Sequence, residues 1–252
     1  MAAPPLVKLA VLIDADNAQP ALAGSLLAEI AHYGTPFAKR AYGDWTGTRL
    51  KGWKEQLLVH SIQPIQQFAY TQGKTATDAA MIIDAMDLLY TKRFDAFCLV
   101  SSDCGFTRLA SRIRESGIVV YGCGDRDTPR PFIAACSKFI FVENAAPVEE
   151  PAPPRSNQST AVLAEASHGV DNWRLTETWL RDAVEATSGD DGWANLAVVG
   201  GLVSKRHPDF DPRSHGYAKL SEMIQDLGIF EVTSRFPAPG KTAVMYAREK
   251  RT

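Results

Sequence analysis

Two short apolar runs of the sequence end in clusters of polar and acidic residues. Leu9–Ile13 is followed by Asp14–Asn17, which reads Asp-Ala-Asp-Asn, and Phe97–Val100 is followed by Ser101–Asp103, which reads Ser-Ser-Asp. Open parallel sheets bind ligands beyond the carboxyl ends of their strands. If these two runs are neighbouring strands, their acidic residues lie at one edge of a sheet and form a candidate site.

Asp78 is the third candidate acid, because it opens a predicted helix over 78–91 and has Thr77 beside it. Three carboxylates in one cleft raise one another's pKa unless a divalent cation neutralises them. Oxygen ligands of this kind suit Mg²⁺ or Mn²⁺. The alternative is structural, since each aspartate alone is also a good helix cap or a favourable charge at a helix N-terminus. The three together favour a site.

The elements that must position these acids alternate from Leu6 to Asn144 between short β-rich runs and longer stretches of helical period. This alternation predicts an α/β fold, a parallel sheet flanked by helices on both faces. The predicted strands are 9–13, 36–42, 62–68, 97–101, 118–121 and 139–142. The predicted helices are 20–32, 48–60, 78–91, 106–116 and 131–136.

A composition change divides the chain after this region. Residues 145–172 are rich in proline and acidic side chains and poor in large apolar ones, which predicts a flexible linker between a domain over 1–144 and another over 173–252. The second region predicts helices at 176–185, 192–202 and 216–227, then strands at 230–233 and 242–246. Three helices followed by a β-hairpin are typical of a small winged-helix domain.

Four motifs of the first region resemble the NYN domain of the LabA-like group, a branch of the PIN-like ribonuclease superfamily. They are Ile13–Asn17, Lys74–Asp78, Val100–Phe106 and Gly117–Gly122, and the resemblance covers about residues 6–144. It implies a PIN-like fold in which Mg²⁺ or Mn²⁺ assists hydrolysis of RNA phosphodiesters. The catalytic, metal-binding carboxylates would be Asp14, Asp78 and Asp103. The orienting residues would be Asn17, Asp16, Asp84, Thr77 and Ser102.

The sequence departs from that family's pattern at one position. Where the family usually has Ser-Asp-x-Asp-Phe, this chain has Gly105 in place of the second carboxylate and Cys104 before it. Loss of one carboxylate lowers the affinity of a hard cation site, although water can fill the position. The departure therefore leaves three functions open: a metal-dependent endoribonuclease, an RNA-binding regulatory protein with a degenerate nuclease site, and a protein-interaction scaffold.

The second region resembles the OST-HTH (LOTUS) domain, a small winged helix associated with RNA binding, over about 175–248. The matching segments include Gly192–Leu196, Phe210–Arg213 and Gly216–Leu220. Residues 173–252 hold 11 basic and 11 acidic side chains, so overall charge does not support RNA binding there. A local cluster gives the candidate contacts, which are Lys205, Arg206, His207, Arg213, His215, Tyr217 and Lys219. We expect Trp193, Leu196, Leu220, Ile224 and Phe230 to be core residues.

Further RNA contacts are expected in the first region at Lys74, Arg108 and Arg112, although each of them could equally be a solvated side chain. The loop Gly43–Gly47 and Trp53 could stack on bases, but anchoring of the loop to the core is the favoured interpretation. The partner is expected to be single-stranded or structured RNA, and a homodimer or a protein bound by the winged helix is also compatible with the sequence.

The overall charge of −2 excludes a broadly basic surface. The first apolar run is too short for a membrane span and lacks a cleavage pattern, which predicts a cytoplasmic protein without a membrane segment. The four cysteines lack zinc-site spacing and fit reduced thiols.

Overall fold

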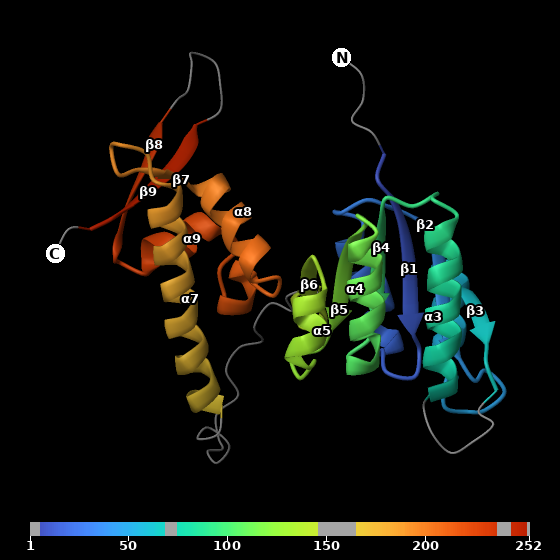
Figure 1. The fold of residues 1–252 in the computed structure, drawn as a ribbon. Coiled ribbons are helices and arrows are strands. Elements are labelled where there is room, and N and C mark those ends of the chain that lie inside the picture. The colour runs from blue at the N-terminus through green and yellow to red at the C-terminus, as the bar shows by residue number, and fades with distance from the viewer. Residues whose placement is uncertain (1–5, 69–74, 146–164, 236–242, 251–252) are drawn as a thin grey trace, which may run out of the picture. The chain divides into compact units, whose positions relative to one another are not determined.

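The computed structural model describes residues 6–68, 75–145, 165–235 and 243–250. The chain forms two compact units, Met1–Val148 and Glu149–Thr252, and each is described by itself (Figure 1). The division falls inside the predicted linker. That linker is shorter than expected, because helix α7 (Glu165–Thr187) begins eight residues before the predicted boundary. The prolines that suggested a linker end at Pro154, so nothing in their pattern excludes a helix from 165 onward.

The first unit is built on a six-stranded parallel sheet with strand order β3-β2-β1-β4-β5-β6. This confirms the predicted α/β class. The strands are β1 (Lys8–Asp14), β2 (Thr35–Gly43), β3 (Gln63–Gln66), β4 (Ala96–Val100), β5 (Val119–Gly124) and β6 (Lys138–Phe141). The chain runs outward from β1 in one direction through β3 and in the other from β4 through β6. The order therefore reverses between β1 and β4, and such a switch point is where sheets of this kind bind ligands.

Helices cover both faces of the sheet, which explains why the central strands β1 and β4 are almost entirely buried. On one face lie α1 (Ala23–Ile30), preceded by the short 3-10 helix η1 (Pro20–Leu22), α2 (Trp53–Val59) and α6 (Val142–Ala145). The other face carries α3 (Thr75–Tyr90), the 3-10 turn η2 (Cys104–Phe106), α4 (Thr107–Glu115) and α5 (Arg130–Ala135). Alternate β1 residues enter the two cores: Leu9, Val11 and Ile13 face α1, whereas Ala10 and Leu12 face α3.

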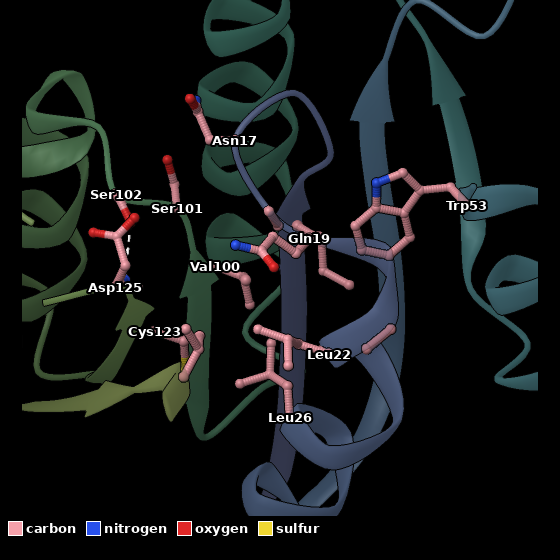
Figure 2. Close-up of a pocket in the computed structure, with 15 residues that line it drawn as sticks. Asn17, Gln19, Leu22, Leu26, Trp53, Val100, Ser101, Ser102, Cys123 and Asp125 are labelled. Carbon is pink, nitrogen blue, oxygen red and sulfur yellow. Dashed lines mark hydrogen bonds between the residues drawn. The ribbon is translucent and has the colours of Figure 1, made fainter. Parts of the chain in front are cut away.

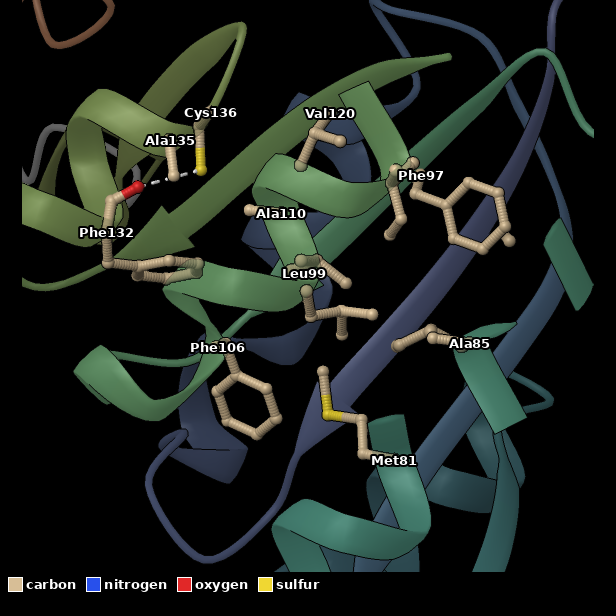
Figure 3. Close-up of a cluster of buried hydrophobic side chains, with 14 of the residues drawn as sticks. Met81, Ala85, Phe97, Leu99, Phe106, Ala110, Val120, Phe132, Ala135 and Cys136 are labelled. Atoms are coloured by element: carbon tan, nitrogen blue, oxygen red, sulfur yellow. Dashed lines mark hydrogen bonds between the residues drawn. The ribbon is translucent and has the colours of Figure 1, made fainter. Parts of the chain in front are cut away.

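The core beneath α3, α4 and α5 contains the largest group of buried aromatic side chains (Figure 3). Phe106 and Met81 lie close to the carboxyl ends of the strands, and both are fully buried. Phe106 directly follows the Asp103–Gly105 segment, so its burial fixes that segment against the sheet. Burial of a phenylalanine side chain contributes roughly 1.5–3 kcal/mol.

Two boundaries in this unit differ from the prediction in ways that matter for the site. Helix α3 begins at Thr75, so Asp78 lies in its first turn and does not open it. Strand β5 continues to Gly124, three residues beyond the predicted end at Tyr121, so that Asp125 follows a third strand. The glycines at 122 and 124 hid this extension. Gly122 is required because a Cβ there would lie 2.5 Å from the Phe139 ring.

The second unit has a small antiparallel sheet of order β7-β9-β8 packed on helices. Its elements are α7, β7 (Ala194–Asn195), α8 (Leu196–Arg206), the 3-10 helix η3 (Pro212–His215), α9 (Leu220–Asp226), β8 (Phe230–Arg235) and β9 (Val244–Glu249). The predicted helix over 192–202 was placed too early, because residues 194 and 195 pair with β9 and the Asn195 side chain caps α8. Within the described residues, no helix has the length and apolar character needed to cross a bilayer.

Candidate active site at the carboxyl edge of the sheet

Asp14 is the last residue of β1 and is only 1 % exposed. Its Oδ2 accepts hydrogen bonds from the Asn17 amide and from the Ser101 hydroxyl, the latter at 2.9 Å, while Oδ1 accepts the Asp16 N–H at 3.2 Å. Burial raises the pKa of the Asp14 carboxyl, and the hydrogen bonds from Asn17 and Ser101 oppose part of that rise. The group is thus held in one orientation by neutral donors.

Ser101 joins the ends of the two strands at the switch point. Its hydroxyl donates to Asp14 and also accepts the Asp103 N–H at 3.1 Å. Asp103 in turn caps the 3-10 turn that follows, because its Oδ1 accepts the Gly105 N–H at 2.7 Å. The predicted proximity of the β1 and β4 ends is therefore present, through a serine whose bridging role the sequence analysis missed. Asp103 therefore also has the role that the structural alternative predicted, because it caps a helical turn.

The start of α3 reaches the same edge through Thr77 and Asp16. The buried Thr77 hydroxyl donates to Asp16 Oδ2 at 3.1 Å, and Arg49 forms an ion pair with Asp16 Oδ1. Asp78 is the next residue of this turn and is half-buried. Asp16 and Thr77 are thus in contact at this edge, and their orienting role stays a prediction, whereas Arg49 was not anticipated.

Asp84 lies further along α3 and binds β2. Its carboxylate accepts hydrogen bonds from the Tyr42 hydroxyl and from Arg40, with which it forms an ion pair. Burial, followed by the hydrogen bond to Asp84, raises the pKa of Tyr42. These contacts attach α3 to the sheet, and an orienting role for Asp84 at the acidic edge stays a prediction.

Asp125 is an acidic residue that sequence reasoning missed. It follows β5, and its backbone N–H donates a hydrogen bond to the Ser102 hydroxyl at 3.0 Å. Figure 2 shows Ser102 and Asp125 together at one side of a small hollow, with Asn17 and Ser101 beside them. The floor of the hollow is apolar and is formed by Leu22, Leu26, Trp53, Val100 and Cys123, among others. An acidic residue directly after a strand could have identified Asp125, but the end of β5 was predicted three residues too early.

We call Asp14, Asp16, Asp103 and Asp125, at the ends of β1, β4 and β5, the acidic edge. Mg²⁺ and Mn²⁺ prefer oxygen ligands such as these carboxylates and the amide and hydroxyl oxygens next to them, so the residue types fit a hard cation. Among the residues that the structure describes, however, no three acidic, histidine or cysteine side chains stand close enough together to form a complete metal site. A cation at Asp14 and Asp103 would therefore rely on water for its remaining ligands, as Mg²⁺ commonly does.

Gly105 lies in the turn after Asp103, with an ordinary right-handed backbone. A Cβ at this position would be 3.2 Å from Asp103 Oδ1. This short distance follows from the cap, in which Asp103 Oδ1 accepts the Gly105 N–H, and the effect of a second acid at position 105 stays a prediction.

The other predicted RNA contacts of this unit are scattered. Lys74 lies outside the described residues. Arg108 is exposed near the start of α4, whereas Arg112 binds the Tyr90 hydroxyl and Ser116 towards the end of that helix. Trp53 is a core residue, as favoured, since it is 2 % exposed and its Nε1–H donates to the Ala15 carbonyl.

In the second unit, much of the predicted RNA-binding cluster makes internal contacts. Arg213 forms a bidentate ion pair with the buried Asp211, in which Nε donates to Oδ1 at 3.1 Å and Nη2 donates to Oδ2 at 2.7 Å. The Tyr217 hydroxyl donates to Asp226, which raises the pKa of Tyr217, and His207 stacks on Trp179. The side chains that remain exposed are Lys205, Arg206 and Lys219.

Trp193 is not part of the core, contrary to expectation. Its ring is half-buried, with the Arg235 and Arg248 guanidinium groups 5.2 and 4.6 Å from its centroid. Glycine at 192 supplies the left-handed φ of 74° that directs the chain into β7 beneath these arginines. The other four predicted core residues do pack in the hydrophobic cluster of this unit.

Comparison with known proteins agrees with this geometry. Residues 8–143 match the family model of the NYN domain, and residues 173–239 match that of the OST-HTH/LOTUS domain. The chain belongs to the NYN domain family, which is part of the PIN-like nuclease superfamily, and it carries a C-terminal OST-HTH/LOTUS domain. The family model does not address the LabA-like branch. No curated protein matches the chain.

Several solved structures are similar to parts of the chain. A crystal structure of a protein of unknown function from Vibrio parahaemolyticus aligns with a TM-score of 0.49 and 17 % identity, over 57 % of this chain and 98 % of that one. An uncharacterised protein from Nitrosomonas europaea is 29 % identical over 42 % of this chain and 90 % of its own, with a TM-score of 0.28. A Chromobacterium violaceum protein is 31 % identical over 31 % and 82 %, with a TM-score of 0.26.

Proposed function

We propose that this protein is a divalent-cation-dependent endoribonuclease whose OST-HTH/LOTUS domain binds the RNA substrate. The observation that carries the proposal is the buried Asp14 carboxylate at the switch point of the sheet, joined to Asp103 through Ser101, in a domain of the PIN-like nuclease superfamily. Burial disfavours the charged form of Asp14, and a cation beside the carboxylate would stabilise that charged form.

In this proposal Asp14 and Asp103 hold the cation with water as the remaining ligands, and Asp78, in the first turn of α3, is the third carboxylate and acts through such a water. A bound Mg²⁺ or Mn²⁺ would lower the pKa of a water and shield the charge that develops on the scissile phosphate. Asn17 and Ser101 keep the Asp14 carboxylate in place by hydrogen bonds, and the Ser102 hydroxyl accepts the backbone N–H of Asp125. Asp16 is turned towards Arg49 and Thr77, and so fixes the position of α3.

The second candidate function is an RNA-binding protein that does not cleave. Gly105 in place of a carboxylate favours it, as does the incomplete set of acids at the described acidic edge. The LabA-like branch and a cytoplasmic location also stay predictions.

The deciding experiment is a Mn²⁺ titration of the cleavage of an end-labelled single-stranded RNA by the full chain, repeated for Asp14→Asn. Asp87→Asn is the matched control, because Asp87 is exposed on α3. We expect cleavage that rises with Mn²⁺, stops with EDTA and falls about 100-fold or more in Asp14→Asn. Cleavage that persists in EDTA would overturn the metal mechanism. RNA binding without cleavage at any Mn²⁺ concentration would favour the second candidate.

A further inference from the structure

A line of three adjoining hollows runs along the carboxyl edge of the NYN sheet. The first is the hollow of Figure 2, beside Ser101 and Asp125. The second lies between the β1 loop and α2, is lined by Asp16 and Arg49, and shares Trp53 with the first. The third shares Leu50 with the second. The acidic edge is thus connected to a surface beyond β2 that the proposed catalytic groups do not use.

We call the third hollow the tryptophan groove. It measures about 400 Å³, which is within the range of small-ligand sites, and its lining consists of Trp45, Gly47, Leu50, Lys51, Lys54, Leu57, Pro64 and Gln66. The loop that forms one wall is held down by Leu50. That contact requires glycine at the end of β2, because a Cβ on Gly43 would be 2.4 Å from Leu50 Cδ1.

Two hydrogen bonds, one from the indole and one from the backbone, fix Trp45 in this groove. Its Nε1–H donates to the Ile65 carbonyl at 2.9 Å, and its backbone N–H donates to Gln66 Oε1 at 2.9 Å. The side chain is half-buried and packs against the core on one side while it lines the groove on the other. An aromatic ring fixed in this way loses little entropy when a base stacks on it.

The charges around the groove complement a phosphodiester chain. Lys51, in the turn before α2, and Lys54, in the first turn of α2, are both exposed and both line the groove. Arg49 is 66 % exposed and lies between them and the acidic edge. Residues 49–54 hold three cations and no acidic side chain, whereas Glu55 follows directly and Asp44 accepts a hydrogen bond from Gln66 at the groove. An acidic cleft repels RNA, and a strip of cations beside it offsets that repulsion.

We propose that the tryptophan groove binds a nucleotide of single-stranded RNA next to the bond held at the acidic edge, with its base stacked on Trp45 and its phosphates at Lys51 and Lys54. A single strand is specified because the bases of a duplex already have both faces stacked. The position of the scissile bond rests on the proposed function, but binding in the groove does not.

Binding is tested with the full chain and a fluorescent single-stranded RNA in EDTA, so that no cation-dependent cleavage intervenes. The charge reversal Lys51→Glu with Lys54→Glu is compared with Lys92→Glu with Arg93→Glu, an equal change of charge on the exposed turn before β4. We expect the affinity to fall about tenfold for the groove variant and less than about twofold for the control.

Because the second domain also binds RNA in this proposal, the contact must be located. Oligonucleotides that contain 4-thiouridine are crosslinked to the protein and the adducts mapped by mass spectrometry. We expect adducts in the peptide that carries Trp45, retained in Trp45→Phe and lost in Trp45→Leu. Both variants lose the hydrogen bond to Ile65, so the difference between them isolates the aromatic ring.

Equal RNA affinity for the two charge-reversed variants, or adducts confined to the second domain, would overturn the proposal that the tryptophan groove binds RNA. The proposed function fails separately. Groove adducts and tenfold weaker binding of the Lys51/Lys54 variant, with no cleavage in Mn²⁺, would support the groove and reject the nuclease. Normal cleavage and an unchanged KM in that variant would do the reverse.

Discussion

At the acidic edge of the NYN domain, Asp14 is buried among donors that carry no charge, namely Asn17, Ser101 and the Asp16 backbone. In the OST-HTH/LOTUS domain, by contrast, Arg213, Arg235 and Arg248 each form an ion pair with a carboxylate of that same domain. The Asp14 carboxylate is thus stabilised by neutral donors, whereas the charges of these three arginines are balanced by ion pairs, as are those of Asp16 and Asp84 in the NYN domain.

The difference has an energetic meaning. Burying a carboxylate among neutral donors costs stability, because desolvation opposes its charged form. An exposed ion pair such as Arg248–Glu231, at 2.5 Å, gains little and mainly fixes two side chains in place. A fold retains a carboxylate buried among neutral donors where a bound ligand compensates the loss of stability. A carboxylate buried among neutral donors thus indicates a binding site better than the number of charged residues does.

The comparison is tested most strongly by Asp103→Asn. Asparagine can still accept the Gly105 N–H and cap the turn, so the fold should survive, while one negative charge of the acidic edge is lost. We expect RNA cleavage in Mn²⁺ to fall about 100-fold and the thermal midpoint to change little. Asp127→Asn, on an exposed turn, is the control. Equal activity of the two variants would mean that Asp103 is only a cap.

On the balanced side, Arg213→Ala should act on stability. It leaves the buried Asp211 carboxylate without its ion-pair partner, and we expect the OST-HTH/LOTUS domain to lose about 1–3 kcal/mol in urea unfolding. Lys219→Ala, at an exposed position, should change stability by less than about 0.5 kcal/mol and instead weaken RNA binding about threefold. If Arg213→Ala weakened RNA binding at unchanged stability, Arg213 would be a ligand contact after all.

The smallest expected effect is a gain. Gly105→Asp adds a carboxylate whose Cβ would lie 3.2 Å from Asp103 Oδ1, so Asp103 must shift by a few tenths of an ångström. We expect Mn²⁺ affinity, measured by calorimetry, to rise about threefold to tenfold, and cleavage to rise with it. Gly105→Asn controls for the size of the side chain. An aspartate variant that binds Mn²⁺ no better than the asparagine variant would show that position 105 does not reach the cation.

The sequence predicted what depends on local pattern. Apolar runs located the six strands of the sheet, and the polar ends of two of them located Asp14 and Asp103 at one edge. It could not supply Ser101 as the bridge between them, since a serine after a strand has no distinctive spacing. Asp125 was missed because glycines at 122 and 124 broke the apolar run of β5. Trp193 was assigned to the core because an aromatic residue carries no sign that two arginines far along the chain will cover it.

The central position of β1 has a consequence for motion. This strand is hydrogen-bonded on both sides, to β2 and to β4, so its amides should exchange with solvent only when the whole domain unfolds. The neighbouring loop 44–52 is held instead by side-chain contacts, namely the hydrogen bond of the Trp45 indole and the buried Leu50. Asp14 therefore stands on the slowest-exchanging part of the domain, and its carboxylate should keep its position while the elements around the sheet fluctuate.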